Sequence, residues 1–170
     1  MTAPEFSRVV DRRHLPAAPL RLAAEEAERK ALAGRFGLVS IGRLEAEVSL
    51  EADGEAVDAQ GTFSADIVQA CAVTGDDLPV TIAEPISLRF VPEAVVEEEE
   101  VELEEEDLDE IPYYGTAFDL GEAIAQSLAL AIDPYATGPD AERVRREKGL
   151  AGEAASGPFA ALAALKDSKT

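Results

Sequence analysis

The feature that most constrains this chain is an acidic run at residues 93–110, which divides the 170-residue sequence into two parts with different patterns. Twelve of the 35 acidic residues lie in it: Glu93, Glu97, Glu98, Glu99, Glu100, Glu102, Glu104, Glu105, Glu106, Asp107, Asp109 and Glu110. Without these twelve, the formal net charge of −20 would fall to −8. Clustered like charges repel one another, so we expect a mobile, disordered acidic loop here. The packed core must come from the residues on either side.

Before the run, the sequence predicts a sheet with one early helix. Residues 5–22 have an extended pattern broken by prolines, residues 23–35 a helical one, and residues 38–92 that of three or four long antiparallel strands. The apolar alternation changes phase at Gly42–Arg43, which predicts a bulge, and Asp53–Gly54 predicts a hairpin turn. The apolar positions from Val80 to Phe90 keep one phase across a break, and Pro85 is typical of a strand start or an edge.

After the run, Asp119 and Glu122 have the spacing that begins a helix, and Leu120, Ile124 and Leu128 form its apolar stripe. We expect this helix, residues 119–132, to cover one face of the sheet. The fold class is therefore α+β, with an antiparallel, open or partly closed sheet and packed helices. Residues 1–148 are expected to form a single domain, followed by a small-residue linker at 149–157 and a short helix or tail at 158–170.

Few residues are suited to catalysis or to holding a cofactor. The chain has one His, His14, and one Cys, Cys71, whose neighbour three positions on is Thr74 rather than a second thiol. A nucleophilic triad and a zinc site both need partners that are missing, so no enzyme activity, metal or cofactor is expected. A hydrolase using two carboxylates stays as an alternative, but it needs two rigidly held acids.

Charge and length also limit the partners. An acidic surface repels phosphate, which argues against DNA as a partner and favours a basic protein. No apolar stretch reaches the roughly 20 residues of a membrane helix, so we expect a soluble, cytoplasmic protein without membrane contact.

Two segments are candidates for binding such a protein. The first is the acidic run, and the second is the terminal segment with its apolar face and a lysine. The candidate residues are Glu98, Glu99, Glu100, Glu104, Glu105, Phe159, Leu162, Leu165 and Lys166. The alternative is direct RNA contact through two small basic clusters, Arg12 and Arg13, and Arg143, Arg145 and Arg146.

Several motifs, in this order, resemble the YceD family, the large-ribosomal-RNA-subunit accumulation proteins. They are Gly61-Thr-Phe63-Ser-Ala-Asp66, Cys71-Ala-Val-Thr74, an acidic insertion, Phe118-Asp119-Leu120, Ile132-Asp133-Pro134 and the tail Gly157-Pro158-Phe159-Ala-Ala-Leu162-Ala-Ala-Leu165-Lys166. The tail is the most specific of these. The chain departs from the family where many members have Cys-x-x-Cys and at Gly157, where Asn is usual.

The resemblance implies a non-enzymatic factor in the synthesis, processing or stability of 23S rRNA in bacteria and plastids. Combined with the charge, it suggests that the protein holds a basic ribosomal protein or ribosome-assembly factor, and contacts precursor rRNA only indirectly.

Overall fold

The computed structural model describes residues 3–93 and 110–148. The chain divides into two compact units, which are taken separately below. The first comprises residues 1–68 and 79–132, and the second residues 69–78 and 133–170. The predicted linker at 149–157, the tail at 158–170 and all but the two end residues of the acidic run lie outside the described residues.

The first unit is built on an open sheet, so the α+β class is confirmed and the sheet is not closed. Its five strands run in the order β2-β3-β4-β5-β6, and β1 and β7 form a separate antiparallel pair. The strands are β1 (Val9–Asp11), β2 (Leu20–Ala23), β3 (Ser40–Asp53), β4 (Ala56–Ala70), β5 (Asp77–Pro92), β6 (Glu110–Tyr113) and β7 (Ala117–Asp119). The helices of the chain are a 3-10 turn (Arg12–His14), α1 (Glu26–Phe36), α2 (Leu120–Ala131) and α3 (Ala141–Glu147).

The long β3–β4 hairpin confirms the alternation that the sequence predicts. Leu44 pairs with Ala65 and Ala46 with Phe63, and all four side chains are buried. The register shifts between Ile41 and Arg43, which is the predicted bulge. Gly54, with φ of +63°, makes the predicted turn between Asp53 and Ala56.

Strand β5 differs from the prediction in one respect. It runs without a break from Asp77 to Pro92, so the predicted interruption near Pro85 is wrong. Beyond β4, its only neighbour among the described residues is β6, which pairs from Arg89 to Pro92. Pro85 therefore lies on an edge, where a residue without an N–H breaks no ladder hydrogen bond. The β5–β6 pairing is parallel, whereas the predicted sheet was antiparallel throughout.

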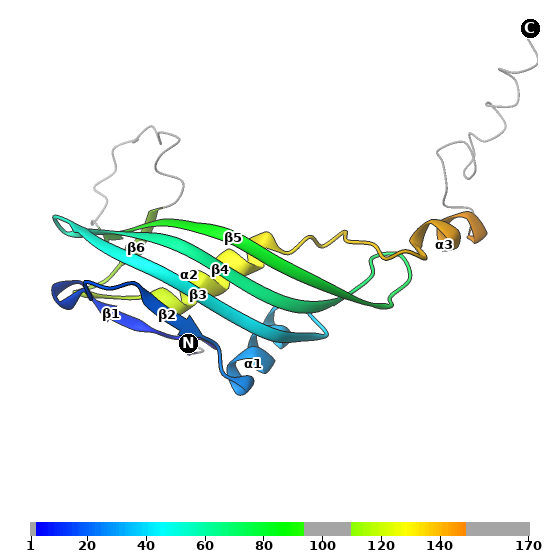
Figure 1. Cartoon of the computed structure of the whole chain (residues 1–170), viewed down its shortest axis with the longest axis horizontal. Helices are drawn as coiled ribbons and strands as arrows, with labels where there is room; N and C mark the ends of the chain where they lie inside the picture. Colours follow the sequence, from blue (N-terminus) through cyan, green and yellow to red (C-terminus); the bar gives the residue numbers. More distant parts are fainter. Residues whose placement is uncertain (1–2, 94–109, 149–170) are drawn as a thin grey trace, which may run out of the picture. The chain divides into compact units, whose positions relative to one another are not determined.

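Helix α2 covers one face of this sheet, as predicted, and passes behind β3, β4 and β5 in Figure 1. The Asp119 carboxylate accepts a hydrogen bond from the backbone N–H of Glu122, which confirms the predicted N-cap. Leu120, Ile124 and Leu128 are fully buried in the core that α2 shares with the strands.

Helix α1 begins three residues later than the predicted range of 23–35. The Glu28 side chain accepts a hydrogen bond from the backbone N–H of Glu25 at 2.7 Å. This contact is one half of a capping box, in which the Glu25 side chain takes the place of the usual Ser, Thr, Asp or Asn and accepts from the backbone N–H of Glu28. A glutamate is not a typical start signal, so the sequence pattern did not mark residue 26 as the first helical residue.

The second unit contains a turn after β4, a connecting segment and α3. The buried Gln69 donates to the carbonyl oxygen of Asp133 at 2.8 Å, and the backbone N–H of Ala72 donates to Ala136 at 3.0 Å. These hydrogen bonds hold residues 69–72 and 133–136 side by side within this unit. The charged segment that follows forms α3, which begins after Asp140 and ends before Lys148.

Candidate functional site

Nine of the candidate residues lie outside the described residues. They are the five acids of the run, Glu98, Glu99, Glu100, Glu104 and Glu105, and the terminal residues Phe159, Leu162, Leu165 and Lys166. Their assignment to partner binding therefore stays a prediction. The five arginines of the alternative are described.

The first basic cluster is largely occupied by neighbouring acids. Arg13 donates to Asp11 through its backbone N–H at 2.9 Å, Nε at 3.0 Å and Nη2 at 2.7 Å, which holds the pKa of Asp11 well below its ordinary value. The Arg12 guanidinium lies 3.5 Å from the Glu55 carboxylate in the β3–β4 turn. His14 is exposed beside Asp11 at 3.8 Å. Both arginines are thus partly neutralised before any phosphate could approach.

The second basic cluster is carried by α3. Arg143 lies 3.6 Å from Asp140 and 3.2 Å from Glu147, and Arg146 lies 3.5 Å from Glu142. These are exposed helical pairs, which contribute little to stability, and an RNA backbone could displace them. Arg145 has no such pair within the described residues.

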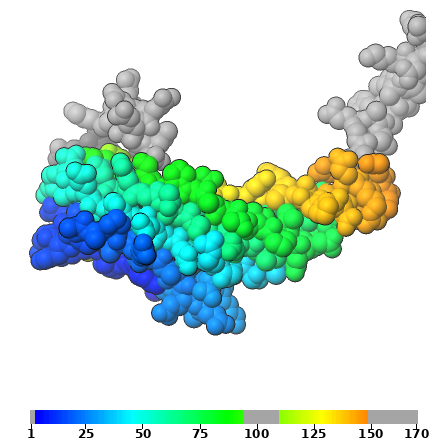
Figure 2. Space-filling model, in the orientation of Figure 1, coloured from blue at the N-terminus to red at the C-terminus, as the bar shows by residue number. Residues whose placement is uncertain are grey.

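The face of the sheet opposite α2 carries the polar residues of β3 and β4. Figure 2 is viewed toward this face, with β3 in cyan and β4 in green-cyan. Its arginines are held by acids across the strands. Arg43 donates to Asp66 at 2.9 Å, Arg89 donates to Asp58 at 2.7 Å, and Arg21 donates to Glu47 at 2.8 Å. Hydrogen bonds from Arg43 and then Thr81 keep the pKa of Asp66 below its ordinary value. This face therefore offers carboxylates and paired arginines rather than free cations.

An aromatic groove lies between α2 and the strands β6 and β7. Phe90 and Phe118 stack with their ring centroids 4.2 Å apart, and Tyr113 lies 6.0 Å from Phe118 in a tilted arrangement. The groove has a volume of about 360 Å³, and Tyr114 and Gln126 are among the exposed residues that line it. Aromatic residues make up only 5% of the chain, and four of the nine line this one groove.

The sequence analysis did not identify this groove. The adjacent Tyr113 and Tyr114 just after the acidic run, in a chain with few aromatic residues, mark this region of the sequence but do not indicate a groove. Their meeting with Phe90 and Phe118 depends on the β5–β6 and β1–β7 pairings, which the sequence did not predict.

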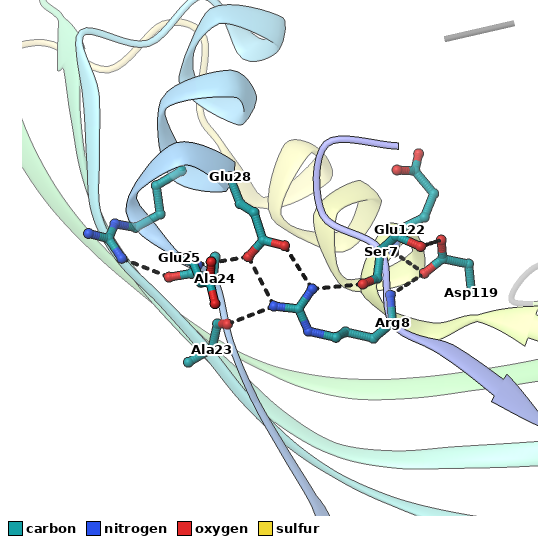
Figure 3. Close-up of polar contacts among 9 residues, drawn as sticks. Ser7, Arg8, Ala23, Ala24, Glu25, Glu28, Asp119 and Glu122 are labelled. Carbon is teal, nitrogen blue, oxygen red and sulfur yellow. Dashed lines mark hydrogen bonds and ion pairs between the residues drawn. The ribbon is translucent and has the colours of Figure 1, made fainter. Parts of the chain in front are cut away.

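A polar network fixes the N-terminal segment beside this groove (Figure 3). The Asp119 carboxylate accepts hydrogen bonds from Ser7 Oγ at 2.6 Å and from the backbone N–H of Arg8 at 2.8 Å. The Arg8 guanidinium donates to both Glu28 oxygens, at 2.7 and 2.9 Å, and so ties the same segment to α1. Arg8 thereby lowers the pKa of Glu28. The acids of this network serve structure, since their hydrogen-bonding capacity is used internally.

Cys71 lies in the second unit and is buried. Its sulfur accepts hydrogen bonds from the backbone N–H of Gly138 at 3.3 Å and of Thr74 at 3.5 Å. Together with the Thr74 side chain, which is the largest contributor, these donors lower the pKa of Cys71 to about 6. The hydrogen bonds to the Cys71 sulfur thus hold residues 71–74 and Gly138 together, and Thr74 acts as a donor.

Neither a metal centre nor a membrane segment is visible in residues 3–93 and 110–148. No three His, Cys, Asp or Glu side chains there come close enough together to bind a metal ion. None of the helices there has both the length and the apolar character needed to cross a membrane. The pKa values of Asp11, Glu28 and Asp66 are lowered, whereas a general acid needs a raised one.

Comparison with known protein families gives a match over most of the chain. The model of the family described as large ribosomal RNA subunit accumulation protein YceD matches residues 59–166. This range begins in β4 and includes the aromatic groove, the acidic run and most of the terminal segment. No curated protein and no solved structure matches the chain.

Proposed function

Since the chain belongs to the YceD family of large ribosomal RNA subunit accumulation proteins, we propose that it supports 23S rRNA accumulation by holding a basic ribosomal protein or ribosome-assembly factor. In this proposal the protein acts in the cytoplasm, uses no cofactor, performs no catalysis and contacts precursor rRNA only through its partner. The family is named for an effect on ribosomal RNA and not for a chemical reaction.

The observation that carries the proposal is the distribution of charge. The chain has a formal net charge of −20, and four of the five arginines that could contact RNA already face carboxylates within 4 Å. Binding of a nucleic acid gains from counterions that free cations release, and few free cations are offered here. Binding of a basic protein is favoured instead, since clustered carboxylates attract it and raise its association rate.

The acidic run is the proposed site of this attraction. Glu98, Glu99, Glu100, Glu104 and Glu105 carry five charges within eight residues. The terminal residues Phe159, Leu162 and Leu165, followed by Lys166, are proposed to add an apolar anchor.

The test is a pull-down of the tagged full-length protein from its own cells, with and without nuclease, followed by identification of retained proteins and RNA. A variant with all five acids replaced by glutamine is compared with a control that has the same change in charge at dispersed sites. The control carries Glu26→Gln, Glu51→Gln, Glu84→Gln, Asp76→Asn and Asp77→Asn, exposed residues without ion pairs in the described part of the chain.

We expect a basic large-subunit protein or assembly factor to survive nuclease treatment, to be lost from the five-acid variant and to be kept by the control. Retained material that disappears with nuclease, and with Arg143→Gln, Arg145→Gln and Arg146→Gln together, would instead establish direct RNA binding. Equal retention by the five-acid variant and the control would contradict a role for this run.

A further inference from the structure

The aromatic groove has the form of a socket for one apolar side chain. Its floor is made by Phe90 and Phe118, which are 1% and 4% exposed, and Tyr113 closes one side. Tyr113 is itself fixed, because its hydroxyl donates to the backbone carbonyl of Glu55. A volume of about 360 Å³ is at the small end of the range for binding pockets and suits a side chain better than a large ligand.

The edge of the groove is exposed and can be changed without touching the core. Tyr114 is 78% exposed and Gln126 is also exposed, although both line the groove. The Tyr114 hydroxyl donates to the Glu93 carboxylate, which raises the pKa of Tyr114. A large exposed aromatic side chain held at the edge of an apolar floor is typical of a protein-binding surface.

The charges around the groove select the kind of partner. No lysine or arginine lines it, although Glu122 of its lining is paired with Arg35 at 2.9 Å, and no lysine or arginine occurs between Arg89 and Arg143 in the sequence. Among the described residues, Glu93 forms no ion pair, and it lies at the end of β5 beside Tyr113, to whose carbonyl its backbone N–H donates at 2.9 Å. A segment that places an apolar side chain on Phe90 and Phe118 therefore brings its neighbouring residues close to carboxylates.

From this combination we propose that the groove between α2, β6 and β7 is the docking site for one apolar side chain of a Lys- and Arg-rich protein segment. This proposal rests on the proposed function and identifies the surface that binds the basic partner. A second copy of this chain fits poorly, because two molecules of charge −20 repel each other. Charge supplies the attraction, and the aromatic floor supplies the selection for the apolar residue.

The test uses two synthetic peptides of alternating lysine and glycine, one with a central leucine and one with serine in its place. Binding of each to the full-length protein is measured by calorimetry at low salt, and the contacted residues are mapped by amide chemical shifts. The leucine peptide should bind roughly tenfold more tightly, because part of a leucine side chain is buried. The shifts should centre on residues 111–126.

Two groove variants and two matched controls complete the design. Tyr114→Ser should reduce the preference for leucine to about twofold or less, and Gln126→Lys should weaken the leucine peptide several-fold by placing a cation at the edge. The controls are Tyr135→Ser, which changes a tyrosine that is 81% exposed in the second unit, and Leu130→Gln, which changes a residue of α2 that does not line the groove. Both controls should keep the full preference.

The outcomes separate this inference from the proposed function. If both peptides bind equally, or if the preference survives in Tyr114→Ser, the groove is not the docking site, even when the five-acid variant still loses its partner. If Phe159→Ser alone tightens peptide binding, the groove is occupied by the chain's own terminal segment, which also overturns the inference. If the groove variants lose the preference for leucine while the five-acid variant keeps its native partner, the groove is confirmed as the docking site and the acidic run is not needed for binding.

Discussion

Gly121 is a position where a single methyl group should have a clear effect on the first unit. It lies in the first turn of α2, directly against the backbone of residues 6–8. A Cβ here would lie 2.7 Å from the carbonyl oxygen of Phe6, 2.8 Å from the nitrogen of Arg8 and 3.0 Å from the carbonyl carbon of Ser7. Comfortable contact needs about 3.5 Å, so the N-terminal segment must move by roughly half an ångström or more in Gly121→Ala.

The movement strains three hydrogen bonds that hold this segment on α2. Ser7 Oγ and the Arg8 backbone N–H donate to Asp119, at 2.6 and 2.8 Å, and the Leu120 N–H donates to the Arg8 carbonyl at 3.0 Å. Hydrogen bonds to a charged group contribute about 1.5–3 kcal/mol each and a neutral one about 1 kcal/mol, so partial loss should cost about 3–5 kcal/mol. The better helix propensity of alanine offsets about 1 kcal/mol of this cost. The net loss of unfolding free energy should be about 2–4 kcal/mol.

Urea unfolding followed by circular dichroism measures this change, and Gly34→Ala is the matched control. Gly34 lies inside α1, where an added Cβ would meet no atom within 4 Å, so alanine should stabilise the protein by up to about 1 kcal/mol. The two Gly→Ala substitutions should therefore change the free energy of unfolding in opposite directions. An unfolding midpoint for Gly121→Ala at or above that of the unchanged protein would refute the close-approach argument.

Three further outcomes follow from the same structure. Ile124→Ala, at a fully buried position, should lower the unfolding free energy by about 2–5 kcal/mol, whereas Leu130→Ala, at a residue 89% exposed on the same helix, should change it by less than about 0.5 kcal/mol in urea titrations. The pKa of Cys71 is about 6 in the folded protein, against 9.0 for a free thiol. Between pH 6 and pH 9 the folded protein therefore binds fewer protons than the unfolded one, so the free energy of unfolding should rise with pH over this range. Thr74→Val removes the largest cause and should flatten that rise, and thiolate absorbance should show a higher pKa. Arg89→Gln breaks the contacts with Asp53 and Asp58, so it should lower the midpoint of thermal unfolding at low salt and lower it less at high salt, where ion pairs are screened.

The parts of the fold that the sequence predicted correctly are those determined by near neighbours. Asp119 and Glu122 are three residues apart, so the cap of α2 could be recognised without any tertiary information. Leu44 and Ala46 face the core because alternation in a strand is also local. The start of α1 was placed three residues early because its N-cap is a glutamate, Glu25, which together with Glu28 looks like ordinary surface charge in the sequence.

The aromatic groove could not be predicted because it depends on distant pairings. Phe90 and Phe118 are separated by the acidic run, and they stack only once β5 pairs with β6 and β7 pairs with β1. Periodicity marks Phe90 as a core residue and gives no information about which edge of the core stays open. For the same reason, the sequence offered Arg12 as a free cation, whereas the turn between β3 and β4 brings the Glu55 carboxylate within 3.5 Å of it.

The parallel pairing of β5 and β6 separates two properties of the acidic run, its length and its composition. Parallel neighbours cannot be joined by a tight turn, because the chain must return along the strand, which takes a dozen or more residues. Residues 93–109 supply seventeen between Pro92 and Glu110, so topology alone explains a long connection. Such connections are usually helices that bury an apolar face on the sheet, and a segment with so many carboxylates is poorly suited to that role. The fold therefore requires the length and not the charge. Glutamine variants keep the length while removing charge, so any function they lose belongs to the carboxylates themselves.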